Sequence, residues 1–445
     1  MKTWIKQPAA TWTGNSLNAP DGIVVEDDKI VELVDGQPSG HCDAVFDAAN
    51  CVLLPGLINC HHHFYQTLTR ALPGALNKEL FPWLQSLYPV WANLNDELVE
   101  ISTRTALAEL MLSGCTTASD HHYVFPPAAQ RAIDQQVMVA SELGMRVVLT
   151  RGSMSLSEKD GGLPPDTVVQ DQETILLESE RLINAYHDPS AGAMTQIALA
   201  PCSPFSVTPE LMQESARLAR RKGVMLHTHL AETEDENSFC LETFGRRPLD
   251  YLEEVEWLAD DVWLAHGIHF DNAEIERLGQ SGVAICHCPS SNMMLASGSC
   301  RVNELKSASV AIGLGVDGSA SNDVSNMMQE VRQAFLLQRL QYGSAAFSHD
   351  VALHLATTGG ACLFGRSDIG QIAPGYQADL ALFSLDDLQF AGSGDPIAAL
   401  VLCGAHRAEA VMVNGQWTVE DQTLLSHDLH QLVERQKAAA VRLMT

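Results

Sequence analysis

Basic residues are scarce in this sequence. The chain has 27 Lys and Arg against 55 Asp and Glu, which gives a formal net charge of −28. This charge repels nucleic acids and anionic membranes at long range, and no local basic cluster offsets it. Proteins that bind polyanions are therefore excluded, and we expect a small-molecule partner, with no nucleic acid and no membrane.

Paired cysteine motifs and long apolar runs are also lacking. The 11 cysteines include no C-x-x-C pair, so neither a disulfide framework nor a zinc ribbon is indicated. No uncharged apolar run approaches the roughly 18 residues of a membrane span, and the first 14 residues lack the apolar core of a signal peptide. With 46% hydrophobic and 18% charged residues, the composition predicts a globular, cytoplasmic protein.

Short β-type segments occur at both ends of the chain. Gly22–Glu26 and Lys29–Leu33 flank a turn at Asp27-Asp28, and Ala410–Val413 precedes the turn pair Asn414-Gly415, a strong hairpin signal. We expect residues 1–55 and 370–425 to form one small, discontinuous β-sandwich domain, followed by a C-terminal helix over residues 426–445.

Between these ends, apolar strand candidates alternate with segments of helical periodicity such as Pro209 to Lys222. The eight candidates are Val52–Asn59, Thr116–Ser119, Arg146–Thr150, Gln196–Ala200, Val224–Leu226, Val262–Ala265, Val283–Ile285 and Ala311–Val316. This alternation predicts an α/β fold, a (β/α)8 TIM barrel over residues 56–369, with its active site at the C-terminal ends of the strands.

Polar side chains gather at these predicted strand ends. They are His61, His62, His63, Asp120, His121, His122, Arg151, His227, His229, Glu232, His266, His287 and Asp317. A single histidine after an apolar run is more often structural than a metal ligand, but so many at one rim favour a metal site. We assign no role to His121, His122 or His287.

Metal chemistry accounts for this pattern. His61 and His63 are two residues apart, so on an extended chain both side chains project from the same face and can bind one ion. His229 and Asp317 are the natural completing ligands, since imidazole and carboxylate suit zinc and also iron. Glu232 follows His229 closely enough to move protons for a water molecule that the ion activates.

Four of these segments together resemble the amidohydrolase superfamily. They are Leu54 to His63, His227 to Glu232, Ala265 to Gly267 and Gly315 to Gly318. The resemblance is to the aminohydrolase branch that binds one metal ion. It implies His61, His63, His229 and Asp317 as ligands of a divalent ion, zinc or alternatively iron, with Glu232, His266 and Asp317 as catalytic residues.

Further segments are similar to members of that branch that deaminate oxidised purines. They are His63–Arg70, Phe81–Trp83, Ser119–Tyr123, Arg151–Leu156, Gly161–Pro165, Cys202–Phe205 and Cys288–Asn292. The implied reaction is hydrolysis of 8-oxoguanine to urate and ammonia, with guanine, isoxanthopterin and hydroxy-s-triazines as alternative substrates. The resemblance also implies a homo-oligomer. A noncatalytic scaffold of the same fold is disfavoured because the whole ligand set is present.

Four residues are candidates for binding the substrate. Gln66 has the spacing of the glutamine with which guanine deaminases read a purine carbonyl and its adjacent N–H. Arg151 is either a cationic fork for ring carbonyls or an ordinary salt-bridge residue. Trp83 either stacks on the flat ring or packs a lid. Ser203 stands where guanine deaminases carry an arginine.

Overall fold

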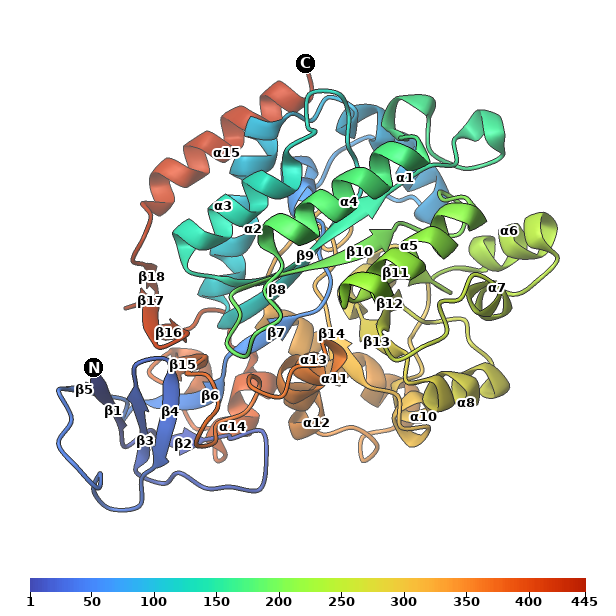
Figure 1. Cartoon of the computed structure of the whole chain (residues 1–445). Helices are drawn as coiled ribbons and strands as arrows, with labels where there is room; N and C mark the ends of the chain where they lie inside the picture. The colour runs from blue at the N-terminus through green and yellow to red at the C-terminus, as the bar shows by residue number, and fades with distance from the viewer.

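A computed structural model describes residues 1–445, and its centre is a closed barrel of eight parallel strands (Figure 1). In order around the barrel the strands are β7 (Leu57–Asn59), β8 (Cys115–His122), β9 (Arg146–Ser153), β10 (Thr195–Pro201), β11 (Leu226–Leu230), β12 (Val262–His266), β13 (Ala284–His287) and β14 (Ile312–Leu314). β14 pairs with β7 at Leu314 and Asn59, which closes the ring. The predicted (β/α)8 barrel is confirmed.

Helices surround the barrel and connect its strands (Figure 1). They are α2 (Asp96–Leu112), α3 (Ala132–Leu143), α4 (Gln172–Tyr186), α5 (Pro209–Lys222), α6 (Glu234–Phe244), α7 (Pro248–Glu254), α8 (Asn272–Ser281), α9 (Pro289–Met294), α10 (Val302–Ser307), α11 (Met327–Tyr342), α12 (His349–His354) and α13 (Gly360–Leu363). α5 has the predicted bounds because Thr208 caps its first turn and Gly223, at φ 68°, ends it. None of the helices combines the length and hydrophobicity that a bilayer crossing requires.

The connection from β7 to β8 is long and contributes to the barrel mouth. It contains the 3₁₀ helix η1 (Phe64–Thr69) and the helix α1 (Leu80–Trp91). Four side chains of α1, namely Leu80, Trp83, Leu84 and Tyr88, line a cavity together with residues from the strand ends. The connection between β7 and β8 therefore forms one wall of the site.

Two further sheets lie beside the barrel. One contains β4 (Lys29–Leu33), β3 (Gly22–Glu26), β1 (Lys2–Lys6) and β5 (Ala44–Asp47); the other contains β18 (Thr423–Leu424), β17 (Gln416–Glu420), β16 (Ala410–Val413), β15 (Leu380–Ser384), β6 (Cys51–Pro55) and β2 (Ala10–Thr11). Ile5 and Ile23 of the first sheet share a buried core with Leu53, Leu380 and Met412 of the second. The expected sandwich of N- and C-terminal segments is thus present.

The remaining elements are short, except for the last helix. They are η2 (Glu158–Asp160), η3 (Asp166–Val168), η4 (Leu355–Gly359), η5 (Leu388–Phe390), α14 (Pro396–Ala399), η6 (Leu400–Gly404) and α15 (Leu429–Leu443). α15 packs along α2 (Figure 1), and Thr105 donates a hydrogen bond to Gln436 Oε1 at 2.9 Å. Gln436 in turn donates to Thr67 Oγ1 in η1, at 3.1 Å. α15 therefore stabilises η1, the segment that directly follows His61 and His63.

Two strand predictions differ from the structure. The apolar run Val52–Asn59 is two strands, β6 in the outer sheet and β7 in the barrel, which meet at Gly56. A Cβ at Gly56 would lie 2.1 Å from Thr116 Oγ1, so only glycine permits the chain to change sheets there. The predicted strand Val224–Leu226 begins and ends too early, because β11 spans Leu226–Leu230 and contains His227 and His229.

A buried ion pair joins the barrel to the outer sheet. Arg146 at the start of β9 donates from Nε to Asp379 Oδ2 at 2.9 Å, and Asp379 Oδ1 accepts from Asn414 N at 2.7 Å. Their side chains are only 1% and 2% exposed.

Replacing Asp379 with alanine leaves the Arg146 guanidinium buried without its carboxylate. We expect Asp379→Ala to lower the free energy of unfolding by about 3–5 kcal/mol, the usual penalty for breaking a buried pair, as measured by urea denaturation. Arg442→Ala, which breaks the exposed pair with Glu97, is the control and should leave stability unchanged. Equal stability of both variants would contradict the role given to this pair.

Candidate active site

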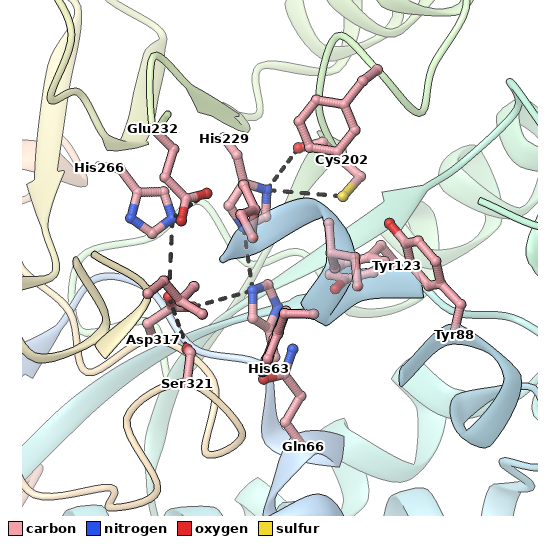
Figure 2. A pocket seen from close by; sticks show the side chains of 15 residues that line it. His63, Gln66, Tyr88, Tyr123, Cys202, His229, Glu232, His266, Asp317 and Ser321 are labelled. Atoms are coloured by element: carbon pink, nitrogen blue, oxygen red, sulfur yellow. Dashed lines mark hydrogen bonds and ion pairs between the residues drawn. The ribbon is translucent and has the colours of Figure 1, made fainter. Parts of the chain in front are cut away.

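Three imidazoles converge at the C-terminal end of the barrel. His61 and His63 follow β7, and His229 lies in β11 across the barrel. His229 Nε2 lies 3.2 Å from His63 Nε2, and His63 Nε2 lies 3.3 Å from Asp317 Oδ1 (Figure 2). His61 Nε2 lies 3.2 Å from the same oxygen. The structure thus brings together the four residues predicted as metal ligands.

The other ring nitrogen of each imidazole is fixed by hydrogen bonding. His63 Nδ1 donates to the carbonyl of His121 at 2.7 Å, and His229 Nδ1 donates to the carbonyl of Cys202 at 2.7 Å. A carbonyl can only accept, so the proton must be on Nδ1 and the lone pair of each ring is on Nε2. The tautomers therefore present metal-ligating atoms to the shared centre.

His61 is held through a second histidine. His227, two residues before His229, donates from Nδ1 to the carbonyl of Trp263 at 2.9 Å, which leaves its Nε2 as an acceptor. His61 Nδ1 lies 2.8 Å from that Nε2 and donates to it. His61 Nε2 is consequently also a lone-pair atom, and His227 orients this ligand.

The donor set fits one divalent metal ion. Zinc–nitrogen bonds of about 2.0–2.1 Å in a tetrahedron place donor atoms roughly 3.3 Å apart, close to the separations seen here. His61 Nε2 is completely buried and has no hydrogen-bond donor near it, so an ion is the partner that its lone pair requires. Three neutral nitrogens and one carboxylate oxygen are ligands that zinc and iron accept.

His121 also lies close to this centre. One of its ring nitrogens is within 4.8 Å of those of His61, His63 and His229. Its Nε2 donates to the carbonyl of Ala200 at 2.9 Å, and its ring stacks on His229 at 4.7 Å. These contacts support the orientation of His229.

Glu232 and His266 lie beside Asp317. His266 Nε2 is 3.4 Å from Glu232 Oε2 and 4.0 Å from Asp317 Oδ2, while its Nδ1 donates to Asn292 Oδ1 at 2.9 Å. Burial raises the pKa of Glu232 above its ordinary value. A raised pKa favours the protonated form of the carboxyl, which is the direction that a proton donor requires.

The backbone at this rim is strained. Ala231, His266 and Asp317 have φ values of 54°, 72° and 62°, a left-handed conformation that non-glycine residues rarely adopt. Glu236, the third residue of α6, accepts hydrogen bonds from the N–H groups of Ala231 at 2.8 Å and Glu232 at 3.1 Å. This buried carboxylate therefore holds the turn that presents Glu232.

A small cavity adjoins the ligand cluster. The lining residues are His63, Gln66, Leu80, Trp83, Leu84, Tyr88, Tyr123, Cys202, Phe205, His229, Glu232, His266, Leu295, Asp317 and Ser321 (Figure 2). Gln66 packs on Gly318, where a Cβ would lie 1.8 Å from Gln66 Oε1, so glycine is needed for the amide to fit. Trp83 donates from Nε1 to the carbonyl of Ala320 at 3.2 Å, which fixes its ring at the cavity wall.

Two of the predicted substrate-binding residues do not line the cavity. Side chains alternate along β9, and Val148 belongs to the barrel interior, so Arg151 points to the opposite side, where it stacks on Phe125 and donates to Gln170 at 2.7 Å. Ser203 is buried, and its hydroxyl pairs with that of Ser206 at 2.7 Å. Its neighbours Cys202 and Phe205 line the cavity in its place.

The structure also shows contributors that sequence reasoning missed. His227 has a detectable signal, because it precedes His229 at the same two-residue spacing as His61 and His63. Asn292 ends a segment that carried the family resemblance. Glu236 and Tyr88 have no such signal, since they come from helices whose placement depends on the whole fold.

Comparison with known proteins agrees with this site. Residues 52–418 match the sequence profile of the Amidohydrolase family, and the chain belongs to that family. It is 60% identical over 445 residues to the 8-oxoguanine deaminase of Pseudomonas aeruginosa, covering 100% of this chain and 99% of the relative. It is 32% identical over 458 residues to an isoxanthopterin deaminase from an unknown prokaryote, covering 97% and 95%.

This chain is also similar in structure to solved proteins. An atrazine chlorohydrolase from Arthrobacter aurescens TC1, complexed with zinc, superposes with a TM-score of 0.94 at 31% identity and covers 98% of this chain and 100% of its own. The predicted membership of the amidohydrolase group is confirmed, and so is the site for a single metal ion.

Removing the His227 imidazole leaves His61 Nδ1 without its acceptor. We expect His227→Ala to weaken metal binding about 10–100-fold, the usual effect of losing a hydrogen bond to a metal-ligating histidine, as measured by chelator competition. His229→Ala should bind almost no metal, and His430→Ala, at the exposed end of α15, should bind normally. Normal affinity in His227→Ala would rule out the orienting role.

Proposed function

We propose that this chain hydrolyses 8-oxoguanine to urate and ammonia with one divalent metal ion, most simply zinc, held by His61, His63, His229 and Asp317. The observation that carries the proposal is 60% identity, over the full length of both chains, to the Pseudomonas aeruginosa 8-oxoguanine deaminase. The site contains the groups that a hydrolytic deamination needs, namely metal ligands, a proton acceptor and a proton donor.

When bound, the metal ion lowers the pKa of a water molecule toward 7 and so makes hydroxide available at neutral pH. Asp317 Oδ2 is directed toward His266 Nε2 and is the proton acceptor for that water. His266 is itself oriented by Asn292, so its Nε2 side faces both carboxylates and stabilises the charge that develops between them.

Glu232 transfers protons to the substrate. Its carboxyl is 5% exposed and can hold a proton because burial raises its pKa. From Oε2 it protonates the ring nitrogen beside the carbon that the hydroxide attacks. This prevents negative charge from accumulating on the ring. The carboxylate so formed takes up the hydroxyl proton of the tetrahedral intermediate and delivers it to the departing amine, so the C–N bond breaks and ammonia leaves as a neutral molecule. The proton that Asp317 accepted from the water then returns to Glu232 by way of His266, which lies within 4.0 Å of both carboxylates.

Gln66 and Trp83 bind the heterocycle in this proposal. The Gln66 amide can accept and donate together, which suits a ring carbonyl beside an N–H, and its Oε1 is buried without a partner. Trp83 forms part of the flat apolar wall of α1. A cytoplasmic location and a homo-oligomeric state belong to the same proposal.

Substrate preference is the direct test. The metal-loaded protein should release ammonia from 8-oxoguanine with a higher kcat/KM than from guanine, isoxanthopterin or a hydroxy-s-triazine. The panel includes isoxanthopterin because of the 32% identical relative. A higher kcat/KM for another member would refute the substrate while retaining the deamination, and no ammonia from any member would refute both.

Glu232 is tested by an isosteric change. Glu232→Gln keeps the shape but cannot carry a proton, so we expect kcat/KM to fall about 10²–10⁴-fold, the contribution typical of a positioned acid–base group. Metal content should remain normal, because Glu232 is not among the ligands. Glu234→Gln, at an exposed neighbouring position, is the control and should retain activity. Loss of metal in Glu232→Gln would show a structural role instead.

A further inference from the structure

The far wall of the cavity contains one polar group that no step above uses. α1 presents Leu80, Trp83, Leu84 and Tyr88 to the cavity, and the Trp83 N–H is already bonded to Ala320. Tyr88 Oη is completely buried and has no hydrogen-bond partner. Burying a hydroxyl without a hydrogen-bond partner costs free energy. Such a hydroxyl is therefore typical of a position where a bound ligand supplies the missing partner.

Tyr88 lies across the cavity from the catalytic groups. Figure 2 shows its ring across the cavity from Glu232 and His266, with His63 and His229 between them, and its hydroxyl directed away from α1. The ring is held by Trp91, whose centroid is 6.0 Å away at 78°. Burial raises the pKa of Tyr88 well above its ordinary value, so the hydroxyl keeps its proton and can donate.

The chemistry of the substrate supplies a matching acceptor. In 8-oxoguanine the carbon that carries the amine and the C8 carbonyl lie at opposite ends of the fused rings. A molecule with its amine-bearing carbon at the metal ligands and Glu232 therefore extends its C8 carbonyl toward the opposite wall, which is formed by α1. Guanine has a hydrogen at C8 and offers no carbonyl there.

We propose that Tyr88 is a specificity-determining residue whose hydroxyl donates a hydrogen bond to the C8 carbonyl of an oxidised purine. This inference rests on the proposed function and adds the residue that distinguishes an oxidised purine from guanine. A site built to donate to a carbonyl disfavours an analogue that lacks it, because the donor is then left buried and unpaired.

Tyr88→Phe tests this with the metal-loaded protein. It removes only the hydroxyl, and we expect kcat/KM for 8-oxoguanine to fall about 10–100-fold while that for guanine changes less than about 3-fold. The control is Tyr251→Phe, which deletes another buried, unpartnered hydroxyl remote from the cavity and should leave the ratio of the two substrates unchanged. Equal losses for both substrates, or no loss, would overturn the proposal.

Binding separates this inference from the proposed reaction. Urate retains the C8 carbonyl and xanthine lacks it, so calorimetry with these two ligands needs no turnover. Tyr88→Phe should weaken urate binding about 10-fold or more and leave xanthine binding unchanged, even if the wild type fails to deaminate 8-oxoguanine. Equal weakening of both ligands, or absence of urate binding to the wild type, would overturn the role of Tyr88.

Discussion

The hydrogen bonds that the Nδ1 atoms of three histidines donate are the constraint on which the site depends. Each bond fixes a tautomer, and each acceptor belongs to the barrel: the carbonyls of His121 and Cys202, and the ring of His227. The Nε2 lone pairs can converge only if β7, β8, β11 and their neighbours keep their register. Metal binding is therefore a property of the closed barrel, and a segment carrying the same histidines outside it would not position them.

Around this centre, the charged side chains that transfer protons lie beside residues with strained backbone conformations. Glu232, His266 and Asp317 meet within 4 Å, and left-handed backbone occurs at His266, Asp317 and the residue before Glu232. Such conformations persist only where the surroundings over-determine them. Here Glu236 secures the turn at Glu232, and Asn292 secures the His266 ring. Rigidity at the rim allows the carboxylates to face the substrate without rearranging.

Local sequence predicted the architecture because the alternation of strands and helices is a short-range pattern. Alternating strands and helices indicated the barrel, and the two-residue spacing of His61 and His63 indicated a shared ion. The pattern could not show that Gly56 divides one apolar run between two sheets, because the reason is the distant Thr116. It also left Arg151 open between a contact with the substrate and a structural role, and the side-chain alternation of β9 turns this side chain toward Phe125. The positions of Tyr88 and Glu236 in the site could not be predicted, because they depend on how the helices α1 and α6 pack against the barrel.

The division of that run at Gly56 also bears on how the molecule assembles. β6 pairs with β15, which lies near the other end of the sequence, and β7, directly after Gly56, closes the barrel against β14. Neither β15 nor β14 has been synthesised when β6 and β7 leave the ribosome. One edge of β6 and one edge of β7 therefore stay unpaired until the later strands are made. Such long-range pairing slows folding. The same glycine that permits the change of sheet thus makes completion of the fold a late event.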